Sequence, residues 1–399
     1  MSGKGNLTFR NRNEFEFLVS CVRDVLNGEG RGQARFHAEV DWNAFTCLAV
    51  RHRVVPQIHH LLSQGVPDSV PHSVREQFAD LNAEIVAHNL TLTAELVRIA
   101  RVFQRRSIPL LAFKGPTLAS ELYGELHQRQ FVDLDLMVRP NDLPAAIELF
   151  HELGYQACSV DLGGMSPSQL RRVVIDSKSY ELVRSEPPHQ YHVDLHWRLS
   201  NDDTFFTNVP ESLFDDATET TISGQPILTM PTRQLVSYLA FHGGNHRWMR
   251  LSWLCDLAHA MRRIPQERWP DLLDEAARCN AERYLIGGLL LLERLQFVNE
   301  LSDTISPVQR RRLSRLVTRM EEVLSADDAA PLLNVLADGY WRYQFSGRVR
   351  PLANSLLRFV RPKQRDFLYE GRVRPYLSRW QYIATKTVTS ILPRGDRDV

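Results

Sequence analysis

The sequence predicts an α+β protein in which a small mixed β-sheet forms a core between two helical regions. Apolar residues recur at helical spacing up to about residue 105 and again from residue 232. Between these regions, short apolar runs are bounded by turn residues, a pattern typical of strands. We therefore expect helical regions at 1–105 and 232–345, an α/β core at 106–231 and a basic tail at 346–399.

The composition is that of an ordinary globular protein. Hydrophobic residues make up 43% and charged residues 24% of the 399 residues, which is enough apolar material for a sizeable core. The net charge of +1 gives no strong signal for nucleic acid as a partner. The five scattered cysteines form no Cys-x-x-Cys pair, which argues against a zinc ribbon or a disulfide framework. We expect a cytoplasmic protein without a transmembrane segment or a signal peptide.

The N-terminal region is expected to be helical throughout its apolar stretches. Phe15, Leu18 and Val22 recur at helical spacing, and a second helix is expected to start near Asp41. A long third helix is predicted from about Val74 to Arg105. From Thr232 onward the helical spacing returns and predicts several further helices.

The predicted core begins with a strand at Ile108–Phe113, which is followed by a turn at Lys114-Gly115. A helix is expected at Thr117–Tyr123, and a second strand at Phe131–Val138. Residues 139–155 then read as a turn, a helix capped by Asn141 or Asp142, and a stop at Gly154, and another short helix follows from Ser166 to about Val174.

A β-hairpin is predicted farther along the core. Its arms are Tyr180–Arg184 and Tyr191–Trp197, and the Ser-Glu-Pro-Pro-His-Gln segment between them has the composition of a turn. If the second arm lies beside the Phe131–Val138 strand, the polar residues of both strands meet on one face of the sheet.

Two carboxylates interrupt the second predicted strand. Asp133 and Asp135 are two residues apart, so on a strand they point to the same face and repel each other. A Mg²⁺ ion resolves this repulsion, because it binds one or two carboxylates together with substrate phosphate oxygens. Asp194 and His196 in the second hairpin arm share a face in the same way. Three carboxylates on two adjacent strands can hold two metal ions for an in-line phosphoryl displacement.

These pieces resemble the polymerase β-like nucleotidyltransferase superfamily, and more closely a bacterial family of uncharacterised nucleotidyltransferases. The resemblance is carried by IPLLAFKGPTLA, QRQFVDLDLMVRPNDLPAAIELFHELGY, VDLHWRL and HRWMRLSWLCDLAHAM, over about residues 105–265. It implies a transferase that binds ATP or another NTP as donor, with Mg²⁺ or Mn²⁺ as cofactor. Members of the family occur beside natural-product and polysaccharide biosynthesis genes, which implies a small-molecule, peptide or glycan acceptor.

The resemblance also implies roles for particular residues. Asp133 and Asp135 correspond to metal ligands, and Asp194 corresponds to the third carboxylate, which binds metal and activates the acceptor. His196 is a further candidate for the site. Nucleotide-binding candidates are Lys114, Gly115 and Arg129, which lie in or near the turns before the acidic strand.

The sequence departs from the superfamily at the phosphate-binding turn. The superfamily usually has Gly-Ser after its first strand, whereas this chain has Lys114-Gly115. Lys114 is expected to substitute for the serine as a point charge on the phosphates, and Arg129 is a second candidate for this role. His242 and His246 have the spacing of a helical metal pair, but the two glycines between them weaken a helix, so an acceptor-site role is the alternative.

Three other interpretations of the acidic motif compete with nucleotidyl transfer. Asp133 and Asp135 could be a salt-bridged pair in a protein that is rich in arginine. Glycosyltransferases also use Asp-x-Asp to hold a metal and a nucleotide-sugar, but strands and helices normally alternate before their motif, and here helices alone are expected. A non-catalytic binding protein with the same fold is the third, and the retention of all three carboxylates argues against it.

Overall fold

The computed structural model describes residues 10–28, 40–64, 70–206, 209–299, 301, 304–326 and 335–346. Apart from Ser346, the predicted basic tail at 346–399 lies outside the described residues. Within them, no helix is both long enough and apolar enough to cross a membrane.

Four helices form the N-terminal region in the described part of the chain. They are α1 (Arg12–Asn27), α2 (Trp42–His52), α3 (Val55–Ser63) and the long α4 (His72–Arg105). Three of them were predicted from the apolar spacing, and one, α3, was not predicted. Asp41 caps α2, because its carboxylate accepts hydrogen bonds from the backbone N–H groups of Asn43 and Ala44, both at 3.0 Å. Helix α4 confirms the long helix that was predicted from about Val74 to Arg105.

A seven-stranded mixed sheet forms the core, in the order β3-β4-β5-β2-β1-β7-β6. Strand β2 runs parallel to β5 and β1 runs parallel to β7, whereas the remaining neighbours are antiparallel. The strands are β1 (Leu111–Ala112), β2 (Leu134–Met137), β3 (Gln156–Ala157), β4 (Ser179–Glu186), β5 (His189–His196), β6 (Thr218–Ile222) and β7 (Gln225–Thr229).

The predicted hairpin is confirmed as β4 and β5, and the second arm does lie beside the acidic strand. The two strands predicted before it are shorter than expected: β1 pairs with β2 over only two residue pairs, and the pairing of β2 with β5 starts at Leu134. Asp133 therefore lies just before β2 instead of within it. Strand β3 and the β6–β7 hairpin were not predicted from the sequence.

Short helices connect the strands. The predicted helix after the Lys114-Gly115 turn is formed by α5 (Pro116–Leu118) and the π-helical turn η1 (Ala119–Tyr123). Asp142 stands at the N-cap position of α6, but its side chain makes no capping hydrogen bond, unlike Ser166 in the capping box of α7. The other connecting helices are η2 (Leu126–Gln128), η3 (Pro140–Asp142), α6 (Leu143–Glu152), α7 (Pro167–Asp176) and α8 (Val209–Asp215).

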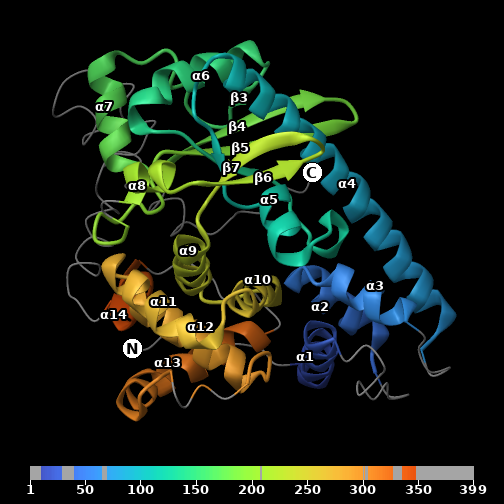
Figure 1. The fold of residues 1–399 in the computed structure, drawn as a ribbon. Helices are drawn as coiled ribbons and strands as arrows, with labels where there is room; N and C mark the ends of the chain where they lie inside the picture. The colour runs from blue at the N-terminus through green and yellow to red at the C-terminus, as the bar shows by residue number, and fades with distance from the viewer. Residues whose placement is uncertain are drawn as a thin grey trace, which may run out of the picture.

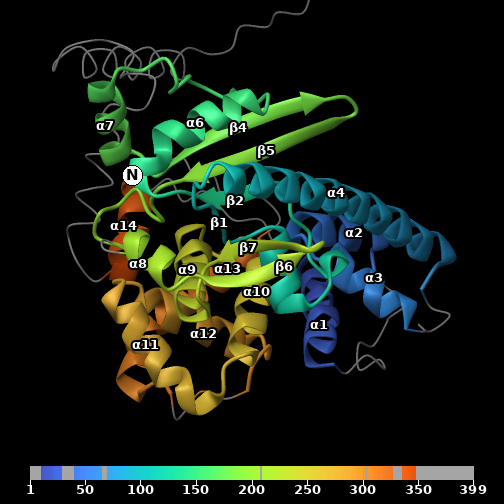
Figure 2. The same cartoon turned by 45° about the horizontal axis from the view of Figure 1, so that its top comes forward.

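The C-terminal region is helical, as predicted. It contains α9 (Thr232–Asn245), α10 (Leu251–Arg262), η4 (Gln266–Arg268), α11 (Trp269–Arg278), α12 (Glu282–Arg294), α13 (Pro307–Ser325) and α14 (Val335–Ser346). These helices lie on the same side of the sheet as α1–α3, whereas α6 and α7 lie on the other side (Figures 1 and 2).

Two hydrophobic cores cover the two faces of the sheet. One joins the sheet to α6 and to the C-terminal half of α4, and it includes Leu134 and Leu136 of β2 and Val193 and Leu195 of β5. The other runs through α1–α3 and the C-terminal helices, and it includes Met137 of β2. Because side chains alternate along a strand, the residues between those leucines and valines face the two helical regions.

Candidate metal and nucleotide site

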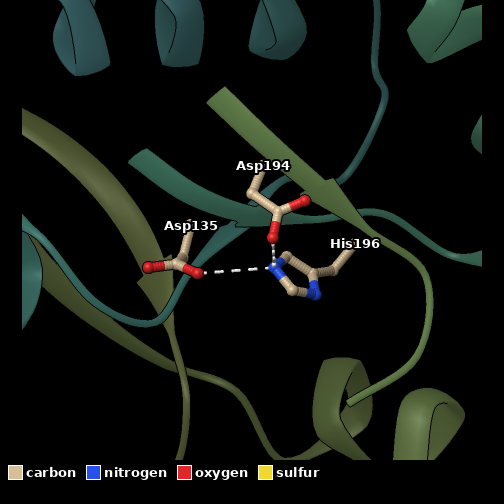
Figure 3. A group of neighbouring side chains, drawn as sticks. All are labelled: Asp135, Asp194 and His196. Atoms are coloured by element: carbon tan, nitrogen blue, oxygen red, sulfur yellow. Dashed lines mark ion pairs between the residues drawn. The ribbon is translucent and has the colours of Figure 1, made fainter. Parts of the chain in front are cut away.

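Asp135, Asp194 and His196 meet on the face of the sheet that is turned toward the helical regions. Asp135 of β2 lies directly opposite Asp194 of β5 in the parallel ladder, and His196 is two residues farther along β5. The neighbouring apolar residues of both strands fill the core on the opposite face. The alternation of each strand thus sends its polar side chains to one place (Figure 3).

The His196 imidazole lies between the two carboxylates. Its Nε2 is 2.9 Å from Asp194 Oδ2 and 3.4 Å from Asp135 Oδ1 (Figure 3). One ligand atom from each of the three residues lies within 4.8 Å of the others. Asp194 Oδ1 and His196 Nδ1 are buried and have no hydrogen-bond partner among the residues that the structure describes. Two carboxylates, an imidazole and an unpartnered carboxylate oxygen fit a divalent cation.

Lys114 approaches the same carboxylate from the turn after β1. Its Nζ is 3.3 Å from Asp135 Oδ1 and 5.3 Å from the centre of the Tyr238 ring on α9. Gly115 next to it has φ 62° and ψ −130°, and a Cβ there would lie 3.3 Å from the backbone oxygen of Asp133. Only glycine adopts this conformation readily, so Gly115 allows the turn to pass close to the acidic strand.

The charges of these groups shift one another's pKa values so that each charged form is favoured. Burial alone would raise the pKa of Asp135, but the charges of Lys114 and His196 hold it well below its usual range. Burial would lower the pKa of Lys114, and the Asp135 charge raises it above its usual value instead. The pKa of His196 is raised in the same way by Asp194 and Asp135. These groups thus favour one another's charged forms.

Asp133 takes a different position from the one predicted for it. It precedes β2 and is more exposed than Asp135, and it is not among the three residues whose ligand atoms lie within 4.8 Å. Burial and the Asp135 charge raise its pKa, whereas Lys114 and Arg53 oppose that shift. The compact group in the structure thus consists of two carboxylates and an imidazole, and not of three carboxylates.

Arg129 is bound to a carboxylate of the C-terminal region. Its Nε and Nη2 donate hydrogen bonds to Asp256 Oδ1 and Oδ2 on α10, at 2.8 and 2.9 Å. Tyr123 OH donates to the same carboxylate at 2.8 Å. This buried pair ties the core to α10, and it leaves only Nη1 of Arg129 without a hydrogen-bond partner.

Residues of α9 and α10 that the sequence did not identify as a group line the same side. The rings of Tyr238, His242 and His246 follow one another along α9 and its C-cap residue. The ring centres of His242 and His246 lie 5.4 and 5.3 Å from the centre of the Trp253 ring. Burial lowers the pKa of His242 most, and the Lys114 charge lowers it further. The four-residue spacing of Tyr238, His242 and His246 is the sequence pattern that predicts their rings on one side of a helix.

No curated protein matches the chain. One solved structure, described as an antigenic nucleotidyltransferase-like protein from Paracoccidioides brasiliensis, matches at 12% identity and a TM-score of 0.33, covering 61% of this chain and 97% of that chain.

A family model described as "Uncharacterised nucleotidyltransferase" matches residues 38–296. This match covers well over half of the chain and includes the whole sheet, the acidic group and helices α2–α12. The chain therefore belongs to this family of uncharacterised nucleotidyltransferases.

Proposed function

We propose that the protein transfers a nucleotidyl group from an NTP to a hydroxyl or phosphate of an acceptor, with a divalent cation held by Asp135, Asp194 and His196. The observation that carries this proposal is the placement of Asp135 opposite Asp194 on two parallel strands, with the His196 ring between them. Family membership supports the nucleotide as substrate.

The bound cation would neutralise charge on the phosphate oxygens during the displacement. The protein supplies the remaining parts of the site. Asp194 has an oxygen, Oδ1, that is not bonded within the protein, so this carboxylate is placed to accept the proton of the acceptor hydroxyl. Lys114 lies on the other side of Asp135, where its ammonium group can bind a phosphate of the donor.

The ligand atoms of the three side chains indicate which metal ion the site prefers. Carboxylate oxygens suit Mg²⁺ and Mn²⁺, whereas an imidazole nitrogen suits later transition metals better than Mg²⁺. The oxygen-oxygen-nitrogen set therefore supports Mn²⁺ beside Mg²⁺ as cofactor.

Asp133, Gly115 and Arg129 complete the proposed nucleotide site. Asp133 would bind a second ion or its waters, and Arg129 would reach a phosphate through Nη1.

The helical regions 1–105 and 232–345 would form the walls around the acceptor through α1–α3 and the C-terminal helices, which lie on the acidic side of the sheet. His242, His246 and Trp253 lie on that side and are candidates for acceptor contacts. The acceptor would be a small molecule, a peptide or a glycan.

A thermal-shift titration tests the proposal. The protein is incubated with each NTP and with UDP-sugars, with Mg²⁺, with Mn²⁺ or with EDTA. We expect an NTP to raise the melting temperature only when a divalent ion is present, and Asp135→Asn to abolish that response. A UDP-sugar response with Mn²⁺ would support a glycosyltransferase instead, and no response to any nucleotide would support a non-catalytic binding protein.

A further inference from the structure

Two arginines beside the acidic site form no ion pair with a carboxylate in the part of the chain that the structure describes. Arg53 follows α2, and Arg250 precedes α10. Both side chains are half-buried, and in the described part of the chain no carboxylate oxygen lies within 4.0 Å of either guanidinium group. Other partly buried arginines in the described part of the chain do have such a partner, for example Arg129 with Asp256 and Arg184 with Glu95.

A hydrogen bond holds these two arginines next to each other. The backbone N–H of Leu251 donates to Nδ1 of His52 at 3.3 Å, and both residues are buried. This bond joins the end of α2 to the start of α10, so the residues that follow His52 and precede Leu251 are brought together. Arg53 has a left-handed backbone conformation with φ 55°, and the Arg250 guanidinium lies 5.3 Å from the centre of the Trp253 ring.

The arrangement concentrates positive charge in front of Asp133. Burial and the neighbouring Arg250 charge lower the pKa of Arg53 to about 10, and the Asp133 charge opposes this shift. The same carboxylate acts on Arg250. One carboxylate thus faces two guanidinium groups that repel each other, and a positive charge is left uncompensated. Two guanidinium groups that share a single carboxylate leave one positive charge free to bind an anion.

We propose that Arg53 and Arg250 form a phosphate-binding pair that clamps a substrate phosphate group beside the acidic strand. This inference deepens the proposed nucleotidyl transfer and rests on it for the identity of the substrate. The phosphate belongs either to the triphosphate tail of the donor or to a phosphorylated acceptor. Since Arg53 comes from the N-terminal region and Arg250 from the C-terminal region, the bound phosphate joins both helical regions to the core.

Calorimetric titration with inorganic triphosphate in the presence of EDTA tests the pair directly. Neither a metal ion nor turnover is required, so the result is independent of the proposed chemistry. We expect wild-type protein to bind triphosphate, and Arg53→Gln and Arg250→Gln each to weaken that binding by about tenfold or more. The lysine variants of both positions keep the charge but lose the fork of donors, so their loss should be smaller.

Two controls keep the result interpretable. Arg311→Gln removes the same charge from an exposed position on α13 and should bind triphosphate like wild type. Because neither Arg53 nor Arg250 forms an ion pair among the described residues, and because they repel each other, the glutamine variants should melt at the wild-type temperature or above it. Failure of wild-type protein to bind triphosphate, or equal binding by the double glutamine variant, would overturn the proposal.

A competition experiment then identifies the source of the phosphate. Triphosphate is titrated into protein saturated with ATP and Mn²⁺. If the donor tail occupies the arginine pair, ATP abolishes triphosphate binding. If a phosphorylated acceptor occupies it, triphosphate still binds in the presence of ATP, and the arginine variants lose that binding. The Asp135→Asn variant should keep metal-free triphosphate binding even if it loses all metal-dependent nucleotide binding.

Discussion

Asp135 and Asp194 lie directly opposite each other on the parallel strands β2 and β5, and the His196 imidazole lies between their carboxylates. Lys114 approaches Asp135 on another side, with its Nζ at 3.3 Å. Each carboxylate of this pair is thus in contact with at least one basic side chain of the protein itself. The stability of the fold and the binding of a metal ion consequently depend on the same side chains.

Asp135→Asn should remove metal-dependent NTP binding and also destabilise the protein. The change leaves Lys114 buried without its carboxylate, and removing one partner of a buried ion pair costs about 3–5 kcal/mol. Urea unfolding without metal measures the free energy of unfolding, and calorimetry measures nucleotide binding. The control Asp80→Asn changes an exposed carboxylate of α4 and should leave both quantities unchanged. Full nucleotide binding by Asp135→Asn would contradict the metal site.

Asp194→Asn should affect turnover more than donor binding. Its carboxylate is more exposed than that of Asp135, and Oδ1 is not bonded within the protein, so we assign it to the acceptor proton. Loss of general-base assistance lowers rates by about 10²–10⁴-fold. The NTP dissociation constant should stay within a fewfold of wild type, whereas release of pyrophosphate should nearly stop. Equal losses in binding and turnover would show that Asp194 acts only as a metal ligand.

Lys114→Met should separate the binding of the metal ion from that of the nucleotide. Without the ammonium group, Asp135 has one cation fewer to share, so the ion alone should bind at least as tightly as in wild type. The NTP should bind about tenfold or more weakly, because a charge-assisted contact to phosphate is lost. Calorimetry with Mn²⁺ alone and then with Mn²⁺ and ATP measures both. Unchanged ATP affinity would leave Lys114 with a role in stability only.

Acidification should destabilise the protein through His52. Burial, followed by the charges of Arg51 and Arg250, lowers the pKa of His52 from its ordinary value of 6.5 to about 3. The unfolded chain therefore takes up a proton on this imidazole at a higher pH than the folded protein does. The contribution of neutral His52 is present above pH 6.5 and is lost progressively as the pH falls toward 3. Protonation would also remove the acceptor of the Leu251 N–H group.

Urea unfolding between pH 7.5 and 4 checks this sign. The stability of His52→Gln should fall less steeply below pH 6.5 than that of wild type. The control His60→Gln changes an exposed imidazole of α3 and should follow the wild-type curve. A steeper decline in the His52→Gln variant would mean that the folded protein protonates this residue readily.

Much of the fold is determined by local patterns of the sequence. The apolar spacing of α4, the turn residues of the β4–β5 hairpin and the alternation within β5 each depend on residues that are close in the chain, so they can be predicted without tertiary contacts. The same alternation places Asp194 and His196 on one face. The family resemblance around Lys114-Gly115 and Asp133-x-Asp135 identifies the class of protein for the same reason, since short motifs carry it.

Only the tertiary structure decided which of these side chains meet. Asp133 lies outside the compact group and one residue before the β2–β5 ladder, which starts at the Leu134–Val193 pair, and strand pairing depends on the partner strand as much as on the sequence of β2. Asp256 binds Arg129, and His52 joins Arg53 to Arg250, through contacts between residues that are distant in the chain. No local pattern encodes such contacts, because they depend on how separately formed helices pack on the sheet. The sequence by itself thus determined the elements and the class of chemistry, whereas packing decided the set of residues that form the site.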